Sequence, residues 1–271
     1  MTVVNSILTR TFDLALAPFA GHPWLGLVLI SLLTGFVLLL VFRFTSNQRG
    51  IKTAKDRIIS HLLEVLLYRD EMRVVVRAQA RLFLDNLRYL GYALVPLAFM
   101  LVPVAFLLLQ TDLRYGNRPL HVGEKTIVAL RLRPGVDLDQ VSISAPAGLA
   151  IETDSLRLPS LNEVDWRLRA TAPGRHNLRF TVAGQEFTKE IVVGQSLARI
   201  STARVARNLW EQFKHPGEPP LPREVPALSA TITYPRAHLD LFGHPAHWIW
   251  PWLIISMAFG YALKGPLRVQ V

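Results

Sequence analysis

Two long uncharged apolar runs enclose a basic block, and this arrangement constrains the fold more than any other feature of the sequence. The runs cover residues 24–42 and 89–109. At about 1.5 Å rise per residue, a helix formed by either run is long enough to cross a hydrocarbon layer of roughly 30 Å. We therefore predict an integral membrane protein with transmembrane helices at both positions.

The block between the runs, residues 43–88, carries ten Lys or Arg residues against five Asp or Glu. Cytoplasmic loops of membrane proteins carry an excess of Lys and Arg, so we expect this block in the cytoplasm. Apolar residues recur there at helical spacing, as in Ile51, Ile58 and Leu62, and residues 68–70 interrupt the pattern before a second helix. The pattern predicts a basic helical hairpin.

The second arm of this hairpin carries arginines at every fourth position. Like charges at this spacing mildly destabilise an isolated helix, so a partner or the membrane surface is expected to compensate. The simplest interpretation is contact with lipid headgroups, and a ribosome, an RNA or an acidic nascent chain is the alternative. The four residues are Arg69, Arg73, Arg77 and Arg81.

Pro96 and Pro103 lie seven residues apart in the second run, on one face of its helix, and each removes a backbone hydrogen bond. We expect a bent helix that packs against a neighbour. A third apolar segment, residues 247–264, is short, but three tryptophans at one end and Lys264 at the other fit the two membrane interfaces. It predicts a third transmembrane helix followed by a cytoplasmic tail, residues 265–271.

Residues 1–23 carry Val4, Leu8 and Phe12 at helical spacing, but Arg10 and Asp13 interrupt any continuous apolar core of the kind a signal peptide needs. We predict an amphipathic helix at the outer interface. The expected topology places the amino terminus outside and the carboxyl terminus inside a membrane, most simply the inner membrane of a prokaryote.

From about residue 118 the apolar periodicity changes from 3.6 to 2. Six short alternating stretches separated by Pro and Gly turns predict an extracytoplasmic, immunoglobulin-like β-sandwich over residues 118–195, with Trp166 in its core. Residues 196–246 are expected to form a helix at 199–214, a Pro-rich linker and a strand near residues 228–234. That strand either joins an edge of the sandwich or runs toward the membrane.

No catalytic constellation is recognisable in the sequence. The chain has no cysteine, no glycine-rich phosphate loop and no hydrolase or zinc-protease motif. His238, His244 and His247 are separated by Pro and Gly residues that disfavour a shared helical face, so we predict no metal site. We likewise expect no enzymatic activity, no cofactor and no small-molecule substrate. The polar residues inside the predicted spans are few, and their hydroxyl groups can bond to their own helices.

The order of parts resembles the YidC/Oxa insertase superfamily, and most closely its three-span branch, which contains the third subunit of the ER membrane protein complex and archaeal relatives. Three segments carry the resemblance: residues 33–48 leading into RGIKTAK at 49–55, the span with its two prolines, and WLIISM at 252–257 continuing to KGPLRV at 264–269. Close relatives have a short loop where this chain has its sandwich.

The resemblance implies a hydrophilic groove, open to the cytoplasm, that eases polar segments of client membrane proteins into the bilayer. It assigns Ser31, Thr34, Arg43 and Ser256 to this groove, and the hairpin to reception of the client. Many family members carry a basic residue inside the groove, whereas Arg43 lies at its mouth. The competing hypothesis is a non-enzymatic scaffold or accessory subunit, in which the sandwich or the arginines bind another membrane subunit.

Overall fold

The structure is a computed structural model that describes all residues except 1, 20, 69, 242 and 268–271. It divides into a β unit, residues 1–27 and 108–250, and a helical unit, residues 28–107 and 251–271. Helices and antiparallel sheets are both present, as the sequence predicts. The helices are α1 (Thr2–Leu16), α2 (Pro23–Thr45), α3 (Gln48–Leu67), α4 (Met72–Tyr115), α5 (Leu209–Lys214) and α6 (Ile249–Leu263).

Two of these helices, α2 and α4, are long and apolar enough to cross a membrane. They contain the predicted spans at 24–42 and 89–109, and they indicate a membrane protein. The helix that falls in the third predicted span, α6, is apolar but has only 15 residues.

The basic block forms the predicted hairpin. Asn47 caps α3 by accepting a hydrogen bond from the backbone N–H of Gly50 at 2.9 Å. Lys55 of α3 contacts Tyr89 of α4, and His61, six residues further along α3, contacts Asp85, four residues before Tyr89 on α4. The two arms are therefore antiparallel. The arms meet at the turn before Met72, close to the predicted break.

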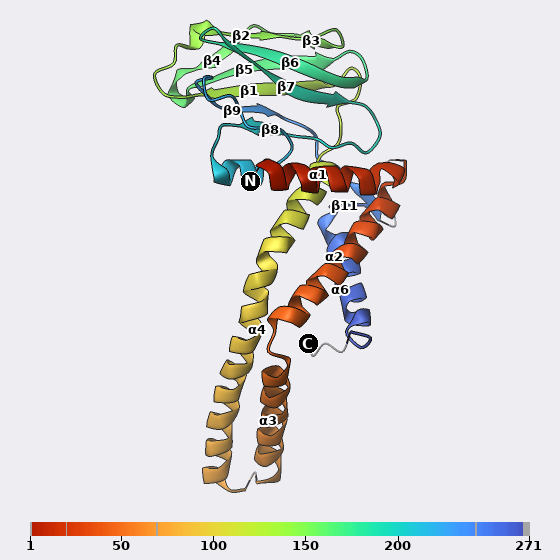
Figure 1. The fold of residues 1–271 in the computed structure, drawn as a ribbon, viewed down its shortest axis with the longest axis vertical. Coiled ribbons are helices and arrows are strands. Elements are labelled where there is room, and N and C mark those ends of the chain that lie inside the picture. Colours follow the sequence, from red (N-terminus) through yellow and green to blue (C-terminus); the bar gives the residue numbers. More distant parts are fainter. Residues whose placement is uncertain (1, 20, 69, 242, 268–271) are drawn as a thin grey trace. The chain divides into compact units, whose positions relative to one another are not determined.

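The second arm of the hairpin and the second predicted span belong to one helix. With 44 residues, α4 is about 66 Å long at 1.5 Å per residue. It continues through Pro96 and Pro103 and ends at Tyr115 (Figure 1). The two prolines therefore do not break the helix.

The β unit contains two antiparallel sheets around one apolar core. The first has the strand order β3-β5-β1-β9-β8, with β4 also paired to β5, and the second has the order β2-β6-β7. A separate pair, β10 and β11, precedes α6 (Figure 1). The strands are β1 (Lys125–Leu132), β2 (Val141–Ser144), β3 (Leu149–Ile151), β4 (Leu156–Leu158), β5 (Glu163–Ala170), β6 (Gly174–Val182), β7 (Gln185–Val193), β8 (Ala203–Val205), β9 (Ala227–Ile232), β10 (Leu239–Leu241) and β11 (His244–Ala246).

An aromatic cluster lies at the centre of this core. The rings of Trp166 and Phe180 meet edge to face at 5.9 Å between centroids, and the rings of Phe180 and Phe187 stack at 5.0 Å. All three side chains are buried. Trp166 is therefore a core residue, as predicted.

The prediction for residues 199–214 was wrong in its first half. Residues 203–205 form β8, which pairs with β9, and the helix begins only at Leu209. The strand near residue 228 joins the first sheet as β9, but it lies between β1 and β8 rather than at an edge. The sheet thus extends well beyond the predicted limit at residue 195, because both strands after that point hydrogen-bond to it.

Helix α1 buries part of the stripe that was predicted to face the membrane. Phe12 and Leu16 are buried, and Phe12 lies 5.5 Å from the guanidinium carbon of Arg114, whereas Ile7 and Leu14 are exposed. Phe12 therefore faces protein. The side chains of Val4 and Leu8 lie outside the described part of the chain.

Arg118 and Glu124 link the end of α4 to the first strand, and this pair predicts acid sensitivity. Two Arg118 nitrogens donate to Glu124 at 2.8 Å each, which, with the backbone N–H of His121, lowers the pKa of Glu124 from 4.5 to about 2. Because the pKa of Glu124 is lower in the folded than in the unfolded protein, the ionised pair stabilises the fold at pH values above 4.5. This stabilisation is lost as the pH falls from 4.5 toward 2.

We therefore expect Glu124→Gln to destabilise the protein at pH 6 and to match the wild type much more closely near pH 2.5. Denaturant unfolding of both proteins across this range measures the difference. A gap that stays constant with pH would contradict this assignment.

Candidate functional site

The outer surface of the hairpin combines exposed apolar side chains with arginines. Arg73, Arg77 and Arg81 are exposed, and the salt bridges of the described residues do not include them. At 3.6 residues per turn, Leu84 and Leu87 project from the same side of α4 as these arginines, and both are exposed. Arg69 lies outside the described residues. Large exposed apolar residues of the hairpin are Ile59, Leu62, Leu63, Leu66, Leu67, Met72, Val76, Phe83, Leu84 and Leu87.

The inner side of the hairpin is fixed by a buried carboxylate. Asp85 is 4% exposed and accepts a hydrogen bond from Arg88 at 2.8 Å. From α3, the Nε2 atom of His61 lies 3.4 Å away and Arg57 3.9 Å away. A buried charge that loses its partners is costly, so Asp85 holds the two arms in one register. The amphiphilic outer surface is consequently presented on a defined scaffold.

Helices α2 and α6 make a close contact in the helical unit. A Cβ atom added at Gly35 would lie 2.5 Å from the backbone oxygen of Ser256 and 3.3 Å from the nitrogen of Gly260. Ser31 precedes Gly35 by four residues, and Ser256 precedes Gly260 by four. Small residues at this spacing let membrane helices approach closely. The two helices therefore pack backbone against backbone.

This contact contains residues that the resemblance assigns to a groove. Ser31 and Thr34 are fully buried, and Ser256 is 6% exposed. The Thr34 hydroxyl donates to Ile30 O at 2.7 Å and lies 3.3 Å from the Nε1 donor of Trp252, while Ser256 donates to its own helix. Arg43 is exposed and lies over the ring of Phe44, apart from this contact. Three of the four residues are thus interior to the helix packing.

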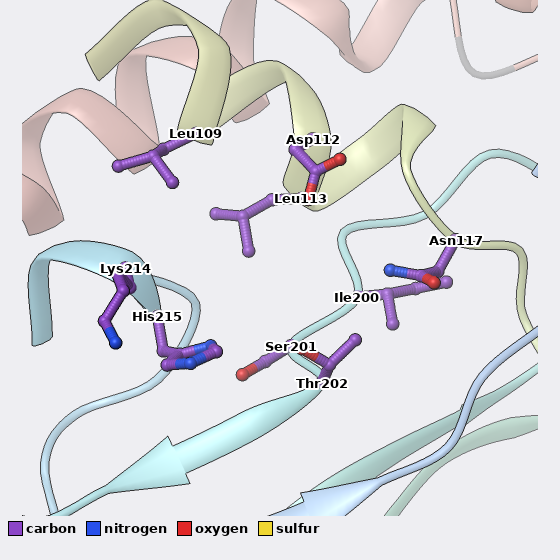
Figure 2. Close-up of a pocket in the computed structure, with 9 residues that line it drawn as sticks. All are labelled: Leu109, Asp112, Leu113, Asn117, Ile200, Ser201, Thr202, Lys214 and His215. Carbon is purple, nitrogen blue, oxygen red and sulfur yellow. The ribbon is translucent and has the colours of Figure 1, made fainter. Parts of the chain in front are cut away.

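A pocket in the β unit lies where the last turns of α4 meet the segment before β8 and the end of α5 (Figure 2). Its chemistry is mixed, with apolar walls and several polar groups. Burial lowers the pKa of His215, which favours a neutral ring, and Lys214 pairs with Glu211 at 2.6 Å. The lining residues are Leu109, Asp112, Leu113, Asn117, Ile200, Ser201, Thr202, Lys214 and His215.

Charged networks hold the surroundings of this pocket. Arg114, 3% exposed, donates to Thr9 O at 3.1 Å, to Gln110 O at 2.6 Å and to Asp13, which also pairs with Arg199 at 2.8 Å. These bonds tie α1, the end of α4 and the segment before β8 together. They are structural bonds, and the described residues contain no group of three potential metal ligands.

Sequence reasoning missed the importance of Asp85, Gly35 and Trp252. In the sequence, Asp85 is only one of five acidic residues in a basic block, and its burial depends on contacts with α3 that no local pattern shows. Glycine and tryptophan in apolar segments are common, so neither residue by itself signals a contact. The pocket combines segments about 90 residues apart, and no local pattern reveals it.

Neither protein-family models nor curated proteins give a match to the chain.

Proposed function

We propose that the chain is a membrane-protein insertase or membrane chaperone whose hairpin receives client segments before they enter the bilayer. The observation that carries this proposal is the hairpin's outer surface, where leucines and arginines share one side of α4. A client segment about to enter a membrane is itself apolar with polar flanks. Covering one Leu or Phe contributes about 1.5–3 kcal/mol, so a few covered side chains suffice for reversible capture.

The proposal includes three membrane crossings, with the amino terminus and the β unit outside and the hairpin inside a prokaryotic inner membrane. The excess of Lys and Arg in residues 43–88 supports the orientation. The close contact of α6 with α2 supports α6 as the third crossing, although 15 residues span only about 22 Å. Lys264 beyond its last turn and Trp250 at its first can anchor the two ends.

The two sheets of the β unit support an immunoglobulin-like sandwich as its fold. The resemblance to the YidC/Oxa superfamily remains part of the proposal, supported by the order of helix, hairpin, helix, β region and helix. Because Ser31, Thr34 and Ser256 are buried, we place the client path along the exposed side of the hairpin and α4 rather than at the α2–α6 contact.

Site-specific photocrosslinking tests client capture. A photoreactive residue at Leu84 is expected to capture short-tailed nascent membrane proteins several-fold more efficiently than one at Gln79. Gln79 is the matched control because it is exposed on the same helix but lies on another side. Depletion of the protein should also reduce insertion of these clients. Equal capture at both positions, together with unchanged insertion after depletion, would refute the proposal.

A scaffold or accessory-subunit role is the second candidate, and the closed α2–α6 contact favours it, since tightly packed helices suit an anchor. In this case the β unit binds another membrane subunit. Purification in mild detergent separates the two roles. One stoichiometric partner that crosslinks to the β unit would indicate a scaffold, and a heterogeneous set of nascent membrane proteins would indicate an insertase.

A further inference from the structure

The short helix α5 exposes two large apolar side chains next to each other. Leu209 is 67% exposed and Trp210 65% exposed, although Trp210 also stacks on Phe213 at 5.9 Å between ring centroids. A tryptophan with an apolar body and a polar N–H is frequent where a protein meets a membrane interface. The position of α5 in the β unit decides whether such an interface is within reach.

We place the level of the membrane in the β unit at Leu109, because it is the last residue of the apolar run of α4. It lines the pocket together with Lys214, the last residue of α5. Figure 2 shows Leu109 and Lys214 toward one end of the pocket and Asn117, which follows α4, at the other. Helix α5 is therefore on the Leu109 side of the pocket.

Basic residues flank the apolar pair on both sides. Arg207 precedes it and is exposed. Lys214 follows it, with its ammonium group 6.0 Å from the centre of the Trp210 ring and paired with Glu211 at 2.6 Å. Aromatic and aliphatic groups between Lys or Arg residues match the boundary between acyl chains and phosphate headgroups. Exposed apolar side chains next to basic ones, at the Leu109 end of the pocket, fit contact with a lipid surface.

We propose that α5 rests on the bilayer, with Leu209 and Trp210 at the acyl boundary and with Arg207 at headgroup phosphates. This contact is a second attachment of the β unit to the membrane, besides the helices that connect to it. It requires that α2 and α4 cross the bilayer, but it does not depend on insertase activity. The occupant is lipid on the side of the membrane where α4 ends.

Because the chain has no cysteine, single spin labels can test the contact in the full chain reconstituted into phosphatidylcholine and phosphatidylglycerol nanodiscs. A label at Leu209→Cys reports on α5. Leu156→Cys is the matched control, since Leu156 is 59% exposed and lies on β4, which pairs with β5 away from β8. Leu33→Cys, on an exposed part of α2, reports whether that helix is in lipid.

We expect the label at position 209 to collide more often with oxygen than with a water-soluble nickel complex, as a lipid-embedded label does, and the label at 156 to show the reverse. Adding Trp210→Ser should shift position 209 toward water. If positions 209 and 156 behave alike, or if neither reagent reaches position 209 because protein covers it, the proposal is wrong. A water-exposed label at 33 would instead overturn the membrane crossing on which it depends.

Discussion

Replacing Glu218 with alanine is expected to lower the free energy of unfolding by about 3–5 kcal/mol, as loss of one partner from a buried ion pair does. The Lys189 side chain is 0% exposed, and its Nζ atom lies 2.5 Å from Glu218 Oε2. Its other partners are the neutral carbonyl oxygens of Ser201, at 2.7 Å, and Glu190, at 3.3 Å. Burial lowers the pKa of Lys189 and the Glu218 carboxylate opposes this, so the alanine variant leaves a buried ammonium without its counter-charge.

Denaturant unfolding of the full chain in detergent, followed by protease susceptibility of the β unit, measures this loss. The matched control is Glu186→Ala, because the Arg179–Glu186 pair is exposed and changes should stay within about 1 kcal/mol. Adding Lys189→Met to Glu218→Ala should recover part of the stability by removing the stranded charge. Equal effects of Glu218→Ala and Glu186→Ala would show that the Lys189–Glu218 pair does not stabilise the attachment of the Pro-rich linker, which contains Glu218, to strand β7.

Replacing Gly35 with leucine is expected to separate α2 from α6 and to cost about 1–3 kcal/mol or more, the usual range for overpacking. The obstacle is backbone, because the Ser256 oxygen would lie 2.5 Å from the new Cβ atom, and no side chain can rotate away to make room. The separation also lengthens the bond between Thr34 and Trp252. Gly91→Leu is the matched control, since Gly91 is also helical and a Cβ atom there meets nothing within 4 Å.

Thermal unfolding of both variants in nanodiscs measures the effect. The Gly35 variant should unfold at a clearly lower temperature than the wild type, while the Gly91 variant should stay close to it. Similar losses in both variants would mean that the leucine acts through the lipid or through helix propensity rather than through the α2–α6 contact.

Alternation of apolar and polar residues was sufficient to predict most of the strands. Val164, Trp166, Leu168 and Ala170 alternate with charged residues in the sequence, and all four are buried. Successive side chains in a strand point to opposite sides of the sheet. In a strand with one buried side, the apolar positions of the sequence therefore show which side faces the core.

The error at residues 199–208 has a physical cause. Val205, Leu209, Trp210 and Phe213 share a helical spacing, and this spacing hides the true start of the helix at its N-cap residue, Asn208. The state of residues 203–205 is decided by hydrogen bonds to β9, more than 20 residues later. Tertiary pairing of this kind overrides a weak local preference.

The candidate sites were predictable to different degrees. Helical periodicity and charge predicted the hairpin and its arginines, because both are local properties. The α2–α6 contact joins Thr34 to Trp252 across 218 residues and depends on where a glycine meets a backbone oxygen. Single-sequence patterns contain no information about such a distance.

The carboxylate of Asp13 has a consequence for how the protein is made. Its two arginine partners lie 101 and 186 residues further along the chain. During translation, α1 is therefore synthesised before either arginine. Both ion pairs of Asp13 can therefore be complete only after the chain as far as Arg199 has been synthesised, so the attachment of α1 to the β unit is a late event in folding.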